Sequence, residues 1–93
     1  MEICKMLTIS TAHISETTYQ QLLNDPESLY PIIVYPKDEY GWFIHKVKKF
    51  DDGPEHIPAD MDALIQMAVR EGCDWLCLDR DGDIISGFTV YEW

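Results

Sequence analysis

The sequence predicts an α+β fold of two layers, in which a mainly antiparallel five-stranded sheet carries two helices on one face. Several short runs rich in β-branched and aromatic residues are bounded by turn residues, which is typical of strands. Two other segments repeat apolar residues at helical spacing and carry capping residues at their ends. A chain of 93 residues has room for one core, so we expect a single domain over residues 1–93 in the order β-α-β-β-α-β-β.

The first strand and the first helix are predicted in the first third of the chain. The run MLTIS begins at Met6 and has the composition of a strand. Ser15 is a suitable N-cap for the helix ETTYQQLLND, because its hydroxyl can accept a hydrogen bond from the first helical turn. The pair Asp25-Pro26 ends this helix, since the residue before a proline avoids the α region.

A hairpin and a second helix are predicted in the middle of the chain. The β-rich runs YPIIVYP and YGWFIHKVKKF are separated by PKDE, a hairpin signal, and the loop DDGPEHIPAD follows them. Pro58 suits the first turn of the second helix, and Gly72 stands where a glycine commonly ends one. The apolar residues of this helix recur at positions i, i+3, i+4 and i+7, which are Met61, Leu64, Ile65 and Ala68.

The last two predicted strands are DWLCLD and GFTVYEW, joined by a turn at Asp81-Gly82. Successive side chains of a strand point to opposite faces of the sheet. We therefore expect one set to face the helices, namely Leu76, Leu78, Phe88 and Val90. The other set would lie on the far face, namely Trp75, Tyr91 and Trp93, joined by Trp42 or Tyr35.

Two helices cannot cover both faces of such a sheet, so part of the far face should be exposed or buried in a homodimer. The alternative, in which these rings pack over one another and over residues 51–57 inside the monomer, stays open at this point. We place a candidate partner-binding site on the far face and its acidic neighbours. Its residues are Trp42, Asp74, Trp75, Asp79, Asp81, Asp83, Tyr91 and Trp93.

The formal net charge of −10 is concentrated in the second half of the chain. Residues 51–93 hold eleven acidic residues and two arginines, whereas residues 1–50 hold six acidic residues and five lysines. The acidic half would repel phosphates, so we expect no direct binding of nucleic acid. It could instead meet a protein with a basic surface, or serve solubility alone.

The sequence shows no apolar run long enough to cross a membrane and no secretory signal, so we expect a cytoplasmic protein without a membrane partner. Three cysteines without a CxxC pair favour reduced thiols over a disulfide framework. The lysines of HKVKKF have the spacing of a solvated strand and are not expected to form a phosphate site.

We expect no metal, no cofactor and no catalytic residues. Asp79, Asp81 and Asp83 resemble the start of a calcium loop, but the glycine and glutamate that such a loop needs are absent from the required positions. Cys73 and Cys77 would lie about 13 Å apart in a strand, too far to share a zinc ion. No GxSxG elbow and no glycine-rich phosphate loop is present.

A small ligand-binding domain or an enzyme that uses His13 or Cys77 remains an alternative, with Cys77 as a candidate exposed thiol.

Three sequence blocks resemble a bacterial protein family. They are LTISTAHISETT, VYPKDEYGWFI and IPADMDALIQMAVREGCDWLCLDRDGDIISGFTVYEW, and the resemblance covers residues 6–93. The family comprises small acidic proteins with a domain of unknown function, encoded on plasmids, prophages and integrative elements. The resemblance implies a bacterial cytoplasm and a mobile-element setting, and it supplies no catalytic residues.

Proteins of that setting often counter host defence, so the resemblance also implies an anti-defence role, such as inhibition of a CRISPR or restriction complex. The resulting hypothesis is a non-enzymatic, acidic interaction module that binds a basic, nucleic-acid-handling protein, in its strongest form by mimicking nucleic acid. A homodimeric structural or regulatory protein is the alternative.

Overall fold

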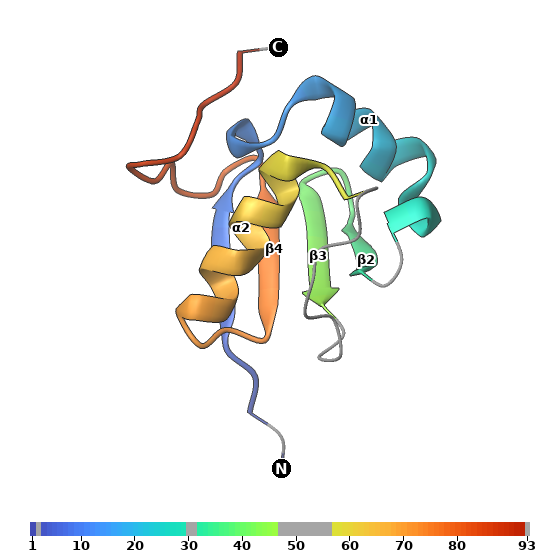
Figure 1. The fold of residues 1–93 in the computed structure, drawn as a ribbon. Helices are drawn as coiled ribbons and strands as arrows, with labels where there is room; N and C mark the ends of the chain where they lie inside the picture. Colours follow the sequence, from blue (N-terminus) through green and yellow to red (C-terminus); the bar gives the residue numbers. More distant parts are fainter. Residues whose placement is uncertain (2, 30–31, 47–56, 93) are drawn as a thin grey trace.

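The computed structural model describes residues 1, 3–29, 32–46 and 57–92, and Figure 1 traces their path. Four strands, two α-helices and two short 3-10 helices are formed within these residues. In chain order they are β1 (Met6–Ser10), η1 (Thr11–His13), α1 (Glu16–Asn24), η2 (Pro26–Leu29), β2 (Ile32–Lys37), β3 (Gly41–Lys46), α2 (Ala59–Arg70) and β4 (Trp75–Asp79).

The sheet is mixed and has the strand order β1-β4-β3-β2. The first and last strands pair in parallel, with Met6 opposite Trp75, and the other two pairings are antiparallel. The predicted α+β class and the hairpin of β2 with β3 are confirmed. The prediction of five mainly antiparallel strands is wrong, because the described part of the chain forms four strands of mixed direction.

The missing strand is the predicted GFTVYEW run. Residues 84–92 leave the sheet and pass η1 on their way to the C-terminus (Figure 1). Their backbone groups bond to η1 and not to β4: the Tyr91 N–H donates to the carbonyl of Ala12 at 2.8 Å, and the side chain of His13 bonds to Ile85 and Thr89. The turn at Asp81-Gly82 forms as predicted, but it leads away from β4 and does not make a hairpin.

The helices begin and end where the sequence places them. The Ser15 hydroxyl accepts a hydrogen bond from the Thr18 N–H at 3.3 Å at the start of α1, and Gly72 follows α2 with a φ of 74°. The carboxylate of Asp60 in α2 accepts hydrogen bonds from the Ser15 N–H at 2.8 Å and the Thr18 hydroxyl at 2.9 Å. This carboxylate therefore joins the first turns of the two helices.

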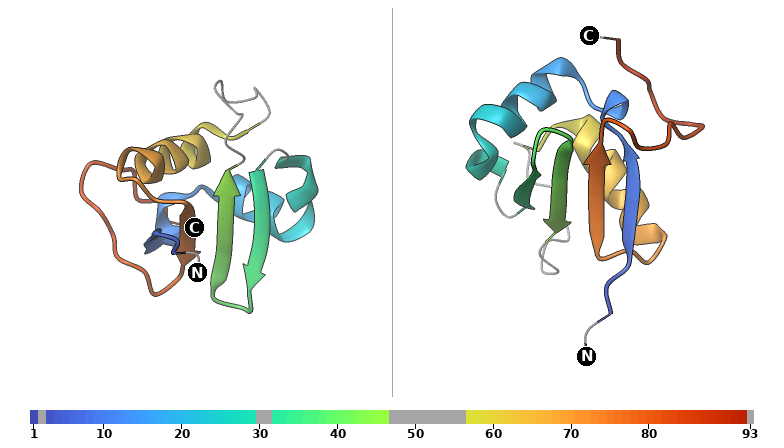
Figure 2. Two further views of the ribbon diagram at one scale, coloured as in Figure 1. Left: turned by 90° about the horizontal axis from the view of Figure 1, so that it is seen from below. Right: turned by 180° about the vertical axis from the view of Figure 1, so that it is seen from behind.

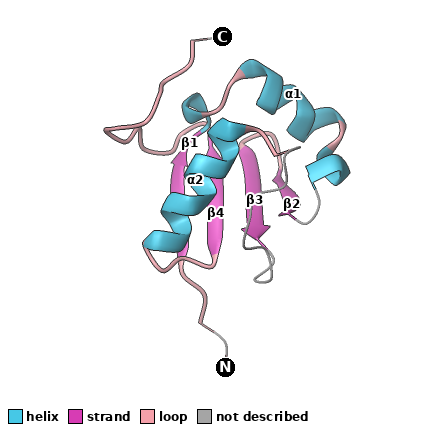
Figure 3. Ribbon diagram, in the orientation of Figure 1, coloured by secondary structure: helices cyan, strands magenta, loops and turns pink. Residues whose placement is uncertain are grey.

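Both helices contribute to one core on one face of the sheet. Figure 3 shows α2 in front of β1 and β4, with α1 near the β2–β3 end, and Figure 2 gives two further views of the same layers. Leu76 and Leu78 are 2% and 0% exposed in this core, as predicted. Phe88 packs against it, but Val90 is 46% exposed because its segment is not a strand. The principal core residues are Ile9, Ile14, Leu22, Leu29, Trp42, Ile44, Met61, Leu64, Ile65, Leu76 and Leu78.

Candidate protein-interaction surface

The second face of the sheet carries aromatic side chains from three strands. In β4 the side chain of Trp75 points away from the core, because its neighbour Leu76 points into it. The register places His45 of β3 opposite Trp75, and Phe43 opposite Tyr35 of β2. We call this surface the aromatic sheet face and define it by Met6, Tyr35, Phe43 and Trp75, together with His45.

The rings of this face contact one another across the strands. The Trp75 and His45 ring centroids lie 4.8 Å apart at an interplanar angle of 77°, and those of Trp75 and Tyr35 lie 5.9 Å apart at 46°. Edge-to-face and tilted arrangements of this kind are favoured between aromatic rings. The cluster therefore has a defined shape, and a shallow hollow of about 390 Å³ lies between Met6, Tyr35, Phe43 and Trp75.

Much of the face remains accessible. Tyr35 is 50% exposed, Met6 is 43% exposed and Ile33 of the same strand face is 37% exposed. Trp75 and Phe43 are half-buried. Mutual packing of the rings thus covers part of their surface, while a continuous apolar area stays in contact with water.

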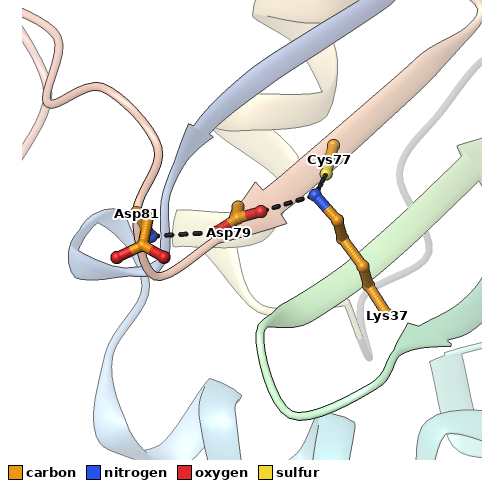
Figure 4. A network of polar contacts seen from close by, with 4 residues as sticks. All are labelled: Lys37, Cys77, Asp79 and Asp81. Atoms are coloured by element: carbon orange, nitrogen blue, oxygen red, sulfur yellow. Dashed lines mark hydrogen bonds and ion pairs between the residues drawn. The ribbon is translucent and has the colours of Figure 1, made fainter.

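A polar group lies on the same sheet face, at the end of β4 (Figure 4). The ammonium of Lys37 forms an ion pair with Asp79 at 2.5 Å and donates weakly to the Cys77 sulfur at 3.9 Å. The other Asp79 oxygen accepts the Asp81 N–H at 2.8 Å. These bonds lower the pKa of Asp79, and its hydrogen bond to Lys37 raises the pKa of that ammonium.

Cys77 shares the strand face of Trp75 but is 1% exposed, so the prediction of an exposed thiol is wrong. Burial raises the pKa of this thiol, and the nearby Lys37 ammonium opposes that effect without outweighing it. A buried thiol held in its neutral form is a poor nucleophile. The geometry at Cys77 is that of a packing residue.

His13, the histidine proposed for the enzyme alternative, uses both of its ring nitrogens in hydrogen bonds. His13 is 2% exposed; its Nε2 accepts the Ile85 N–H at 2.9 Å, and its Nδ1 lies 2.9 Å from the Thr89 carbonyl oxygen. An N–H can only donate and a carbonyl can only accept, so the ring must be neutral with its proton on Nδ1. Both nitrogens are therefore used to hold the C-terminal segment.

The structure brings together only some of the predicted site residues. Trp75 lies on the aromatic sheet face. Asp79 lies on the same face at the end of β4, where it pairs with Lys37 and accepts the Asp81 N–H. The exposed Asp74, next to Trp75, accepts the Lys5 N–H at 3.1 Å. Tyr35, which the sequence offered as an alternative to Trp42, belongs to the face.

The remaining predicted residues lie elsewhere. Trp42 is 7% exposed on the core face, where its ring meets Tyr19 edge-on at 5.3 Å, so its prediction as a far-face residue is wrong. Tyr91 packs beside η1, and the Asp83 carbonyl accepts the Ser10 N–H at 2.9 Å, so neither contributes to the aromatic sheet face. Trp93 lies outside the described residues, as do residues 51–56 of the loop and Lys48 and Lys49.

Phe43 and His45 were missed by the sequence reasoning. The signal was available, because both alternate with Ile44, a typical core residue, along GWFIHK. Within the described residues, no group of three or more His, Cys, Asp or Glu side chains could hold a metal ion. No helix in the same part of the chain is both long and apolar enough to cross a membrane.

Comparison with known proteins identifies a family over almost the whole chain. Residues 6–93 match the family described as "Family of unknown function (DUF5983) C-terminal domain". No curated protein and no solved structure gives a significant match. The predicted resemblance to a family of unknown function is confirmed, whereas its plasmid and prophage setting stays a prediction. The chain belongs to the DUF5983 family of unknown function and matches its C-terminal domain.

Proposed function

We propose that this protein is a non-enzymatic binding module whose aromatic sheet face binds a partner protein with a basic surface. The observation that carries the proposal is the continuous apolar area of Met6, Tyr35, Phe43 and Trp75 on a sheet face opposite the packed core. Apolar patches rimmed by polar groups mark interaction sites in many proteins. Tyrosine and tryptophan are also the side chains that most often dominate binding energy at protein interfaces.

The charge of the chain supports a basic partner. The net charge is −10, the exposed Asp74 stands beside Trp75, and the exposed Asp81 stands at the polar end of the face. The ammonium of Lys37 on this face is neutralised by Asp79. Negative charge around an apolar centre attracts a cationic surface at long range and fixes its orientation as the apolar groups come into contact.

Among basic proteins, we propose one that handles nucleic acid. Such proteins carry basic patches that bind phosphates, and an acidic protein can occupy the same patch in competition with them. In the bacterial mobile-element setting that the resemblance implies, the partner would belong to a host-defence complex of the CRISPR or restriction type. The inhibitory role would then follow from exclusion of DNA or RNA from that patch.

The test uses the full chain to capture partners from a bacterial lysate, together with two matched variants. Met6→Ser/Tyr35→Ser removes exposed apolar groups from the aromatic sheet face. The control Val69→Ser/Ile84→Ser removes side chains that are 49% and 63% exposed outside that face. A protein recovered by the wild type is purified, and its affinity is measured directly for all three chains.

We expect the aromatic-face variant to weaken binding at least about tenfold and the control to leave it unchanged. Affinity should fall as salt rises, and double-stranded DNA should compete. The proposal fails if both variants bind alike, if affinity is independent of salt, or if DNA binds alongside the protein. If no partner is recovered and light scattering shows a dimer that Met6→Ser/Tyr35→Ser disrupts, the homodimer alternative replaces the proposal.

A further inference from the structure

A second concave surface lies on the other side of the sheet, between α1 and the β2–β3 hairpin. Its volume is about 610 Å³, within the range of small-molecule and side-chain binding pockets. One wall is formed by Leu22 and Leu23 of α1, and the other by Val34 of β2 and Trp42 of β3. We call it the α1 groove. It shares no lining residue with the hollow of the aromatic sheet face.

The interior of the α1 groove is apolar and includes the indole ring of Trp42. Leu22 is 2% exposed and Trp42 is 7% exposed, whereas Leu23 on the outer wall is 52% exposed. No hydrogen bond of the Trp42 indole N–H is found among the described residues, and this N–H is not one of their buried polar atoms without a partner. The N–H is therefore accessible to water, and it could donate to the carbonyl oxygen of an incoming ligand.

The rim of the groove at the hairpin turn is negatively charged. Asp38 and Glu39 are exposed, and among the described residues neither carboxylate has a hydrogen bond or an ion pair. Among the described residues, Arg80 is the cation that lines the groove. Its guanidinium carbon lies 4.7 Å from the centroid of the Tyr40 ring, and its backbone N–H donates to the Tyr40 carbonyl at 2.8 Å. Arg80 thus contacts the turn from one side and leaves two carboxylates unpaired.

We propose that the α1 groove binds a linear peptide segment with one or two apolar side chains next to a lysine or arginine. The apolar side chains would pack between Leu23, Val34 and Trp42, and a backbone carbonyl would accept from the Trp42 indole. The cationic side chain would pair with Asp38 and Glu39, to which the net charge of −10 also attracts it. This inference rests on the proposed function as a module for basic proteins, because it names the part of such a partner that occupies this site.

The experiment selects peptides from a displayed library of random linear 12-residue sequences against the immobilised full chain. We expect enriched sequences to combine aromatic or aliphatic residues with lysine or arginine. Synthetic versions are then titrated by calorimetry, and the contact site is mapped by amide and indole chemical shifts. Shifts should concentrate on Leu23, Val34, Tyr40 and the Trp42 indole.

Two pairs of variants separate the apolar and the ionic contributions. Leu23→Glu should weaken peptide binding at least about tenfold, whereas Val69→Glu, at a position on α2 with a similar exposure of 49%, should leave it unchanged. Asp38→Asn/Glu39→Gln should weaken binding about three- to tenfold and flatten its salt dependence. Asparagine tolerates the left-handed conformation of Asp38, at φ 46°, so this variant keeps the turn. Glu71→Gln/Glu92→Gln removes two exposed carboxylates that do not line the groove.

Failure of the groove and failure of the proposed function are distinguishable. Peptides that bind the Met6→Ser/Tyr35→Ser chain as tightly as wild type, and lose affinity in Leu23→Glu, support the groove even if the aromatic sheet face has no partner. The groove inference is overturned if no apolar–basic peptide is enriched, if shifts map to Tyr35 and Trp75, or if Val69→Glu weakens binding equally. In each of those cases, the proposed function would still be supported by a partner whose binding depends on the aromatic sheet face.

Discussion

Nδ1 of His13 donates a hydrogen bond to the carbonyl oxygen of Thr89 at 2.9 Å, and this contact joins residues 76 positions apart in the chain. The same ring accepts the Ile85 N–H at 2.9 Å and meets the Phe88 ring edge-on at 6.2 Å. A single buried imidazole thus provides bonds that a β-ladder would otherwise provide for residues 85–89. The path of the C-terminal segment therefore depends on this side chain, together with the bond from the Tyr91 N–H to the Ala12 carbonyl and the packing of Phe88 against the core.

We predict that His13→Phe destabilises the protein by about 2–4 kcal/mol, because it leaves the Ile85 N–H and the Thr89 carbonyl without their partners. Urea denaturation measures the loss, and hydrogen exchange should show faster exchange at Ile85. His45→Phe is the matched control, since the buried Nδ1 of His45 has no partner among the described residues and its removal should cost less than about 1 kcal/mol. Equal losses in the two variants would contradict the role given to His13.

Gly41, the first residue of β3, is predicted to tolerate a side chain less well than Gly87 does. A Cβ built at this position would lie 1.7 Å from the carbonyl oxygen of Leu78, on the paired strand β4, and φ is 156°. Gly41→Ala must therefore push β3 away from β4 and should cost roughly 3 kcal/mol or more. Gly87→Ala, at φ 91° with open space around its Cβ, should cost about 1–2 kcal/mol from backbone strain alone. Thermal unfolding of both variants compares them, and a smaller loss for Gly41→Ala would refute the close approach.

Local patterns predicted the parts of the fold that depend on nearby residues. The N-cap at Ser15, the end of α2 at Gly72 and the inward side chains of Leu76 and Leu78 follow from capping chemistry and from strand alternation. Alternation also places Trp75 and Leu76 on opposite faces of the sheet, so the position of Trp75 on the aromatic sheet face could be predicted from the sequence. Each of these features depends only on residues that are close together in the sequence.

The parts that were wrong depend on contacts between distant segments. Alternation assigns side chains to faces but does not say which strands are neighbours, so the parallel pairing of β1 with β4 could not be read from the sequence. The run GFTVYEW has strand composition, yet its backbone bonds go to His13 and Ala12. Trp42 is different, because its spacing of two residues from Ile44 places both side chains on the same face of β3, and both are buried in the core.

The Lys37–Asp79 pair gives stability a defined dependence on pH. The pKa of Asp79 is lowered from 3.8, so the folded state binds this proton less tightly than the unfolded chain does. The resulting contribution is present above about pH 4 and is lost as the pH falls through the lower folded pKa. The pKa of Lys37 is raised from 10.5, so its contribution is present below that value and is lost as the pH rises through the higher folded pKa.

Asp79→Asn should therefore be less stable than wild type at about pH 7, and the difference should shrink at about pH 3. Urea titrations at the two pH values measure it. Glu71→Gln is the control, because no described residue pairs with the Glu71 carboxylate, and it should stay close to wild type at both values. A gap between Asp79→Asn and wild type that is the same at both pH values would show that the ion pair adds nothing to the folded state.

Cys77 should be the slowest of the three thiols to react with a soluble disulfide reagent. Cys4 is exposed and Cys73 is half-buried, whereas Cys77 is 1% exposed and burial raises its pKa, so little thiolate is present and little of it is reachable. We expect its labelling to be at least about 100-fold slower than that of Cys4 in the folded protein, and the rates to converge in denaturant. Cys77→Ala identifies the slow phase by removing it. If Cys77 instead reacts as fast as Cys4, the nearby Lys37 ammonium must outweigh burial, and the enzyme alternative that uses this thiol would regain its chemical basis.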